Sequence, residues 1–423
     1  MKLMNQKSKL GNMAKHKWTF KSRFRRETYS WNGTALASKR MREAVGEIKR
    51  VAKNDPALAG EGVIELFVRL YPALMHIDSS SGALGTAMNK TIDFLTPILI
   101  KADWDMNTRG KQLNKLYDAI IEDGWGTFDS LRDYWGDLCV YPGLAHLWAD
   151  QFMDCTKDVL SSTNQYCSAV DMCLSCLVYT ERYQELEELL QLDERHSWFH
   201  HKFWANALVK QGKLQEALDY AGHILSQQRT NNSKPEIDRF CESVLIDMGK
   251  IEEAYEKYGL KMPSYGTNLN VYRGICKKYP TVDKRKVLLD LIEKSGIKGK
   301  WFAAAKTAGQ LDIALGCAMT GDSDPDTLLR ATRDFAEKDP EFALKVGIEA
   351  VMIYLTGSFY DPIAPIDIRA AFTKLMSAAS KSDGQQWVKT ELSKRVLKES
   401  NRIKADLRET ILGLLKQESR NAL

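Results

Sequence analysis

A six-residue pattern that recurs in the second half of the chain limits the possible folds more than any other feature. It reads GKLQEA at residues 212–217 and GKIEEA at 249–254, with a third copy at 309–314 and a weaker one at 181–186. In such a pattern the glycine ends one helix and turns the chain, and the small alanine lets the next helix pack closely. The pattern predicts helical hairpins that stack as an α-solenoid over residues 163–380.

The N-terminal half shows helical periodicity without the repeat. Apolar residues fall at helical spacing from Ser38 onward, and Asn54-Asp55-Pro56 ends one helix and starts the next. A third helix should kink at Pro97. Further helices are expected at 107–123, 128–138 and 142–161. Because alternating strand patterns are nearly absent, the sequence predicts an all-α fold with a helical domain over 37–162.

The last segment, residues 381–423, carries apolar side chains from Trp387 to Leu414 on one stripe, with charged residues between them. A helical array needs a polar terminal cap, so we expect a C-terminal amphipathic capping helix. A dimerising coiled coil is the alternative, weakened by Glu399 and Asp406 at or beside seam positions.

Composition excludes several classes of protein. With 44% hydrophobic and 27% charged residues, the chain is neither disordered nor rich in linkers. No stretch approaches 18 apolar residues, and the first 13 residues lack an apolar core, so we expect neither a membrane span nor a secretory signal. The eight cysteines should then be thiols, and the expected location is cytoplasmic.

Positive charge is concentrated at the N-terminus. Residues 1–53 hold fifteen Lys and Arg against three Glu, and residues 1–36 form a basic arm in which cations and aromatic rings interleave. Cations neutralise phosphates and rings stack on unpaired bases, so the arm is a candidate contact for single-stranded nucleic acid. The alternatives are an arm whose rings dock on the same protein, and an acidic protein partner. The candidate residues are Lys17, Trp18, Phe20, Lys21, Arg23, Arg25 and Arg26.

Motifs that carry chemistry are weak. Cys173 and Cys176, followed by His196 and His200, imitate a zinc site, but the segment between them already matches a helical hairpin. A glycine-containing stretch at 82–86 lacks the lysine spacing of a phosphate loop. We therefore predict no catalytic residue, no metal site and no cofactor.

Tryptophans gather between residues 100 and 150, at Trp104, Trp125, Trp135 and Trp148. Large rings with one polar atom suit both a packed core and a surface that binds a partner. Core packing and an aromatic binding surface are the two interpretations, of which we favour core packing.

The recurring six-residue pattern and the residues before it resemble a known repeat family. Ala205, Leu208, Gly212, Leu214 and Ala217 match the small, large, glycine, large and alanine positions of tetratricopeptide repeats, although leucine replaces both aromatic residues. The second half thus resembles degenerate repeats of that family, whose spacing is a strict 34 residues where this chain has 31 and 37.

Most of the chain also resembles a bacterial family of uncharacterised helical-repeat proteins. The similarity rests on residues 37–49, 77–86 and 300–306. It implies a bacterial, cytosolic, all-helical protein and no particular activity.

Three functions are compatible with these observations. The first is a non-enzymatic scaffold that binds protein partners on its repeat surface. The second is a nucleic-acid-binding component of a bacterial defence or regulatory complex, with the basic arm as its contact. The third is an enzyme with an unfamiliar helical site. Salt-dependent binding to generic oligonucleotides would separate the first two.

Overall fold

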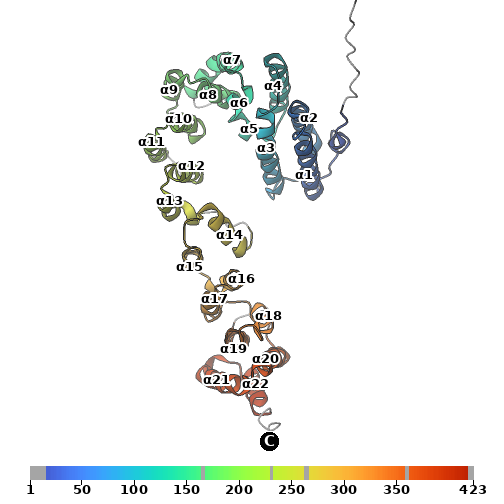
Figure 1. Cartoon of the computed structure of the whole chain (residues 1–423), viewed down its shortest axis with the longest axis vertical. Helices are drawn as coiled ribbons and strands as arrows, with labels where there is room; N and C mark the ends of the chain where they lie inside the picture. The colour runs from blue at the N-terminus through green and yellow to red at the C-terminus, as the bar shows by residue number, and fades with distance from the viewer. Residues whose placement is uncertain (1–15, 163–166, 229–231, 262–265, 358–361, 418–423) are drawn as a thin grey trace, which may run out of the picture. The chain divides into compact units, whose positions relative to one another are not determined.

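The computed structural model describes residues 16–162, 167–228, 232–261, 266–357 and 362–417. In these ranges the chain forms 22 α-helices and five short 3₁₀ helices and contains no strand, so the all-α prediction is confirmed (Figure 1). The chain divides into two compact units, Met1–Ile237 and Asp238–Leu423. The division falls inside the segment predicted as a solenoid.

The helices of the first unit pack against their neighbours in sequence, α2 against α1, α3 and α4, and α8 against α6, α7, α9 and α10. Their bounds are η1 (Thr19–Arg23), α1 (Thr34–Val51), α2 (Pro56–Leu74), α3 (Ala83–Ile100), α4 (Met106–Ile121), α5 (Asp129–Arg132), α6 (Trp135–Cys139), α7 (Pro142–Leu160), α8 (Val170–Tyr179), α9 (Tyr183–Leu190), α10 (Trp198–Lys210) and α11 (Leu214–Gln227); α12 (Lys234–Asp247) spans the boundary.

In the second unit α19 is buried along most of its length and packs against α17, α18, α20 and α21. A helix that is apolar on all sides needs such a cover. The elements are α13 (Ile251–Tyr258), η2 (Gly259–Lys261), α14 (Asn268–Lys278), α15 (Lys284–Ser295), η3 (Lys298–Trp301), α16 (Phe302–Thr307), α17 (Leu311–Ala318), α18 (Pro325–Phe335), α19 (Pro340–Thr356), α20 (Pro365–Ala379), η4 (Ser380–Ser382), α21 (Gln385–Lys398), η5 (Ser400–Arg402) and α22 (Ala405–Gln417).

The recurring sequence pattern forms the turns that its glycines predict. Gly212, Gly249 and Gly309 all have φ between +74° and +76°. In each turn the glycine N–H donates to the carbonyl three residues earlier, and the next N–H donates to the carbonyl five residues earlier. These are the two bonds of a Schellman cap. Glu181 adopts the same conformation at φ +59°, so the weaker copy keeps the turn without a glycine.

The segment predicted as one helix at 128–138 is instead two short helices, α5 and α6. Ser175 of α8 explains the break, because its hydroxyl donates to the carbonyl of Asp133 at 2.7 Å and accepts from the N–H of Gly136 at 3.0 Å. A side chain at position 136 would collide with the α8 backbone at Ser175. The break therefore lets α6 approach α8 closely.

The C-terminal capping helix is also divided, into α21 and α22. Residues 400–402 form the short helix η5, and Ile403 then adopts an extended backbone at φ −94° and ψ 130° that buries its side chain. Serine and asparagine at 400 and 401 are poor helix formers, which favours the break there. The sequence stripe could not show it, because apolar residues continue at helical spacing on both sides.

Three of the four clustered tryptophans are core residues, as the favoured interpretation expected. Trp104, Trp135 and Trp148 are buried, and the rings of Trp135 and Trp148 meet edge to face. Trp125 is 42% exposed and packs on Tyr71, and both residues line a pocket of about 380 Å³. The core explanation thus holds for all but Trp125.

Two further findings bear on the sequence expectations. Cys155 and Cys167 form a disulfide, so the prediction that all cysteines are thiols was wrong; the six others are free. Cys155 lies within α7 and Cys167 lies between α7 and α8, with Cα atoms 6.8 Å apart. Composition alone cannot show that two cysteines are this close. Within the described ranges, no helix is long and apolar enough to span a bilayer. The cytoplasmic location stays a prediction.

Candidate functional site

The aromatic residues of the predicted nucleic-acid contact are docked on the protein itself. Trp18 is 5% exposed, and Phe20 and Phe24 are each 1% exposed. The indole of Trp18 lies against Gly62 of α2, where a Cβ atom would overlap the ring. These rings cannot stack on bases in this conformation, so the docking alternative describes the arm from residue 16; residues 1–15 lie outside the described residues.

Acidic residues of α1 and α2 fix the docked arm. The buried carboxylate of Glu47 accepts hydrogen bonds from the backbone N–H of Thr19 at 2.8 Å and from its hydroxyl at 2.5 Å. Lys21 forms an ion pair with Glu65 at 3.0 Å. The arm is thus held by a covered apolar surface and by charge-assisted hydrogen bonds, which are stronger than neutral ones.

The cations of the arm divide into engaged and exposed groups. Arg23, like Lys21, pairs inside the molecule, here with Glu43. Lys17, Arg25 and Arg26 are exposed, and Arg26 makes a loose pair with Glu27 at 3.5 Å. Whether these three contact phosphates stays a prediction, without the stacking rings that the sequence interpretation had placed beside them.

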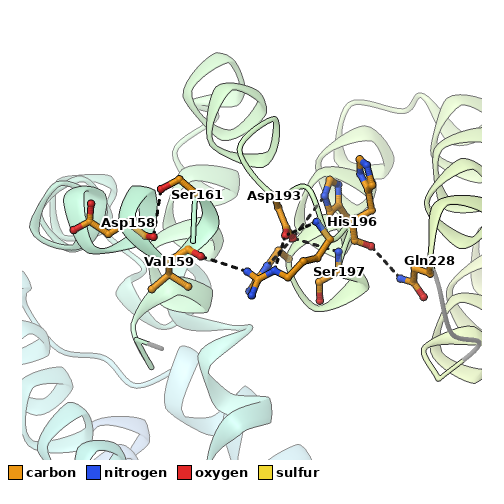
Figure 2. Close-up of polar contacts among 10 residues, drawn as sticks. Asp158, Val159, Ser161, Asp193, His196, Ser197 and Gln228 are labelled. Carbon is orange, nitrogen blue, oxygen red and sulfur yellow. Dashed lines mark hydrogen bonds and ion pairs between the residues drawn. The ribbon is translucent and has the colours of Figure 1, made fainter. Parts of the chain in front are cut away.

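A buried polar cluster that the sequence interpretation missed lies between α9 and α10 (Figure 2). The side chain of Asp193 is fully buried and accepts from the backbone N–H of Ser197 at 3.2 Å and from Nε of Arg195 at 3.1 Å. The ring Nδ1 of His200 lies 3.0 Å from the same carboxylate. His196 has φ +48°, a strained conformation for this residue.

The cluster ties its turn to neighbouring helices. Figure 2 shows contacts from this turn to Val159 and Gln228 on either side. Arg195 donates to the carbonyl of Val159 at 3.3 Å, and Gln228 donates to the carbonyl of His196 at 3.1 Å. These contacts connect the 193–197 turn to α7 on one side and to the residue after α11 on the other. The strained turn is therefore explained as a structural junction.

Charges in the cluster are set by burial and by these partners. Burial raises the pKa of Asp193, but hydrogen bonds and charge from His200 and Arg195 bring it down to about 2. Burial lowers the pKa of His201 to about 4, although Asp193 opposes this. Its Nδ1 meets the hydroxyl of Tyr220. A buried carboxylate beside a neutral, covered imidazole can hold a turn.

The zinc-like motif is not assembled as a site. Cys173 and Cys176 are buried on α8, and burial raises the pKa of the Cys173 thiol to about 11. Metal binding requires the thiolate, which this environment disfavours. Among the residues that the structure describes, no three His, Cys, Asp or Glu side chains are placed to share a metal ion.

A cationic cleft between α18 and α20 is the candidate site that the structure adds. It has a volume of about 560 Å³, and its floor is made of the buried apolar residues Leu329, Ala336 and Ala378. Each helix contributes residues three, four or seven positions apart, which share one helix face. The polar lining residues are Asp326, Arg330, Arg333, Thr373, Lys374, Ser377 and Lys381.

The four cations of this cleft are exposed and loosely held. Arg330 lies 3.7 Å from Asp324, and Arg333 pairs with its neighbour in sequence, Asp334, at 2.8 Å. Lys381 pairs with Glu337 at 2.8 Å. Lys374 forms no ion pair with another described residue. Exposed pairs of this kind contribute about 1 kcal/mol or less, so a ligand can replace them.

Comparison with known proteins adds no relative. No family model matches the sequence, and neither a curated protein nor a solved structure gives a match. The resemblance to a bacterial family of helical-repeat proteins and to tetratricopeptide repeats therefore stays a prediction, and function has to be argued from the sites themselves.

Proposed function

We propose that the chain is a non-enzymatic interaction scaffold that binds an acidic segment of a partner protein in the cleft between α18 and α20. The observation that carries this proposal is the convergence of Arg330, Arg333, Lys374 and Lys381 on one apolar floor. A concave apolar surface with a few well-placed polar groups is the usual form of a binding site.

The chemistry of the lining favours a carboxylate-bearing peptide. Arginine side chains bind carboxylates through two parallel hydrogen bonds, and two arginines stand on the α18 wall. The hydroxyls of Thr373 and Ser377 on the opposite wall can bond to a peptide backbone. An extended peptide advances about 3.3 Å per residue, so a cleft this size holds a few residues with their aliphatic stems on the floor.

A labelled hexaglutamate peptide tests the proposal by fluorescence anisotropy. Replacing Arg333→Gln together with Lys374→Gln should weaken binding about thirtyfold, because each of the two charged contacts is worth roughly a kcal/mol. The matched control is Arg369→Gln with Lys394→Gln, which removes the same charges from exposed positions of the same unit outside the cleft.

Two outcomes would contradict the proposal. In one, hexaglutamate binds the cleft variant and the control equally, which makes the attraction one of net charge. In the other, a 20-base-pair DNA duplex displaces the peptide from the cleft and loses affinity in the cleft variant, which assigns the cleft to nucleic acid instead.

A further inference from the structure

Helix α1 carries a row of cations on one face. Lys39, Arg42, Lys49, Arg50 and Lys53, here called the basic stripe, are all exposed; the first four lie on α1 and Lys53 in the turn that follows it. With about 100° of rotation per residue, their positions fall within roughly a third of the helix circumference. The sequence interpretation counted these charges within residues 1–53 but named candidate contact residues only in the arm.

Among the described residues, no carboxylate forms an ion pair with a cation of the stripe. Lys39, Arg42, Arg50 and Lys53 form no ion pair with another described residue, and Lys49 lies over the ring of Phe94, 4.0 Å from its centroid. Such cations remain available to a ligand.

The docked arm accounts for this lack of compensation. Glu43 and Glu47 are the acidic residues within α1. Glu47 is buried beneath Thr19, and Glu43, at the edge of the stripe, pairs with Arg23 and Arg40. Because Thr19 and Arg23 of the docked arm occupy these two carboxylates, neither forms an ion pair with a cation of the stripe.

Gly46 lies in the middle of the stripe, and nothing within 4 Å surrounds the place of its absent Cβ. Packing therefore does not require glycine there, and glycine weakens a helix by about 0.5–1 kcal/mol relative to alanine. A residue without a side chain does allow a ligand backbone to approach the helix between the flanking cations.

We infer that the basic stripe of α1 binds the phosphate backbone of double-stranded nucleic acid without reading its bases. From Lys39 to Arg50 the helix advances about 17 Å, and a duplex carries one charge per ~1.7 Å of its axis. A rigid row of cations suits this regular array. Single strands gain affinity from stacking rings, and the arm's Trp18 and Phe20 are covered.

The test measures binding of a 20-base-pair DNA duplex of arbitrary sequence to the full chain as salt is varied. Replacing Lys39→Gln with Lys53→Gln removes two contacts, so the log–log salt slope should become shallower by about 1.8, and affinity at ~50 mM salt should fall about tenfold or more. The matched control, Lys111→Gln with Lys115→Gln, removes two exposed lysines from α4 of the same unit and should leave the slope unchanged.

A second substitution probes the centre of the stripe without endangering the fold. Gly46→Glu places a carboxylate among the cations at a position with free space and should reduce duplex affinity at least tenfold. Gly46→Gln, of the same size, should retain more affinity than Gly46→Glu. Equal binding by these two variants, an unchanged slope in the lysine variant, or tighter binding to the single strand of the same sequence would overturn the inference.

Discussion

The arm and helix α1 are adjacent basic segments with opposite roles for their cations. In the arm, Lys21 and Arg23 pair with acidic residues of α1 and α2. In α1, the basic stripe faces solvent. Charge density in a sequence is thus a poor guide to which cations are free. A cation is paired or free according to whether the apolar residues beside it pack on the protein. Those of the arm do pack, and Lys21 and Arg23 then meet glutamates.

Removing the anchor of the arm should have the largest effect. Trp18→Ala deletes a buried ring that fills the space beside Gly62, and such deletions cost about 3–5 kcal/mol of the free energy of unfolding. Thermal or urea unfolding measures the change. The control is Trp31→Ala, because Trp31 is 65% exposed and should change stability by about 0.5 kcal/mol or less. Similar losses in both variants would refute the docked arm.

One glycine in each region differs in the space around its absent Cβ atom: Gly62 lies against the arm, and Gly46 lies in the stripe. Gly62→Ala puts a methyl group into the ring of Trp18 and should destabilise the protein by about 1–3 kcal/mol. Gly46→Ala, in the stripe, meets nothing and should stabilise α1 by about 0.5–1 kcal/mol. Urea unfolding of the two variants should therefore shift in opposite directions, and a shift in the same direction would contradict the close contact at Gly62.

Lowering the pH should weaken the ion pairs that hold the arm, whereas the lysines and arginines of the stripe keep their charge. Burial raises the pKa of Glu65, but hydrogen bonds from Arg69 and Lys21 outweigh this and lower it. A lowered pKa means that the ion pairs stabilise the folded state above the ordinary glutamate value of 4.5 and lose that contribution as the pH falls through the lowered value.

The variant Glu65→Gln checks this dependence by thermal unfolding across pH. It should be less stable than the natural chain at pH 7, by about 1 kcal/mol or less, and the difference should vanish in acid. Glu61→Gln, at an exposed position on the same helix, serves as the control and should show no difference at either pH. A difference for Glu65→Gln that persists in acid would show that the effect is not electrostatic.

Sequence reasoning reached the local structure and stopped at contacts between distant residues. The glycine turns at 212, 249 and 309 follow from a pattern six residues long, and periodicity alone could have placed the basic stripe on one face of α1. The cleft could not be found this way, since it joins residues of α18 and α20 that are about forty positions apart.

The Asp193 cluster could be predicted from the sequence only in part. One buried aspartate followed by histidines at 196, 200 and 201 is a local signal, and it could have drawn attention to the turn. Its meaning depends on Val159 and Gln228, whose carbonyl and amide contacts reach the turn from α7 and from the residue after α11. The sequence interpretation considered only His196 and His200, as part of a zinc motif, and did not consider Asp193.

The smallest expected change in stability comes from removing two cations from the basic stripe, and the matched change in the arm compares the two regions directly. Lys39→Gln with Lys53→Gln removes two exposed charges and should change the free energy of unfolding by less than about 0.5 kcal/mol. Lys21→Gln with Arg23→Gln removes as many charges from the arm and should cost somewhat more, about 0.5–1 kcal/mol, because both pair with glutamates. Duplex DNA binding should show the reverse order, with the stripe variant losing affinity and the arm variant largely keeping it. If the arm variant loses more affinity than the stripe variant, the exposed face of α1 is not the nucleic-acid contact.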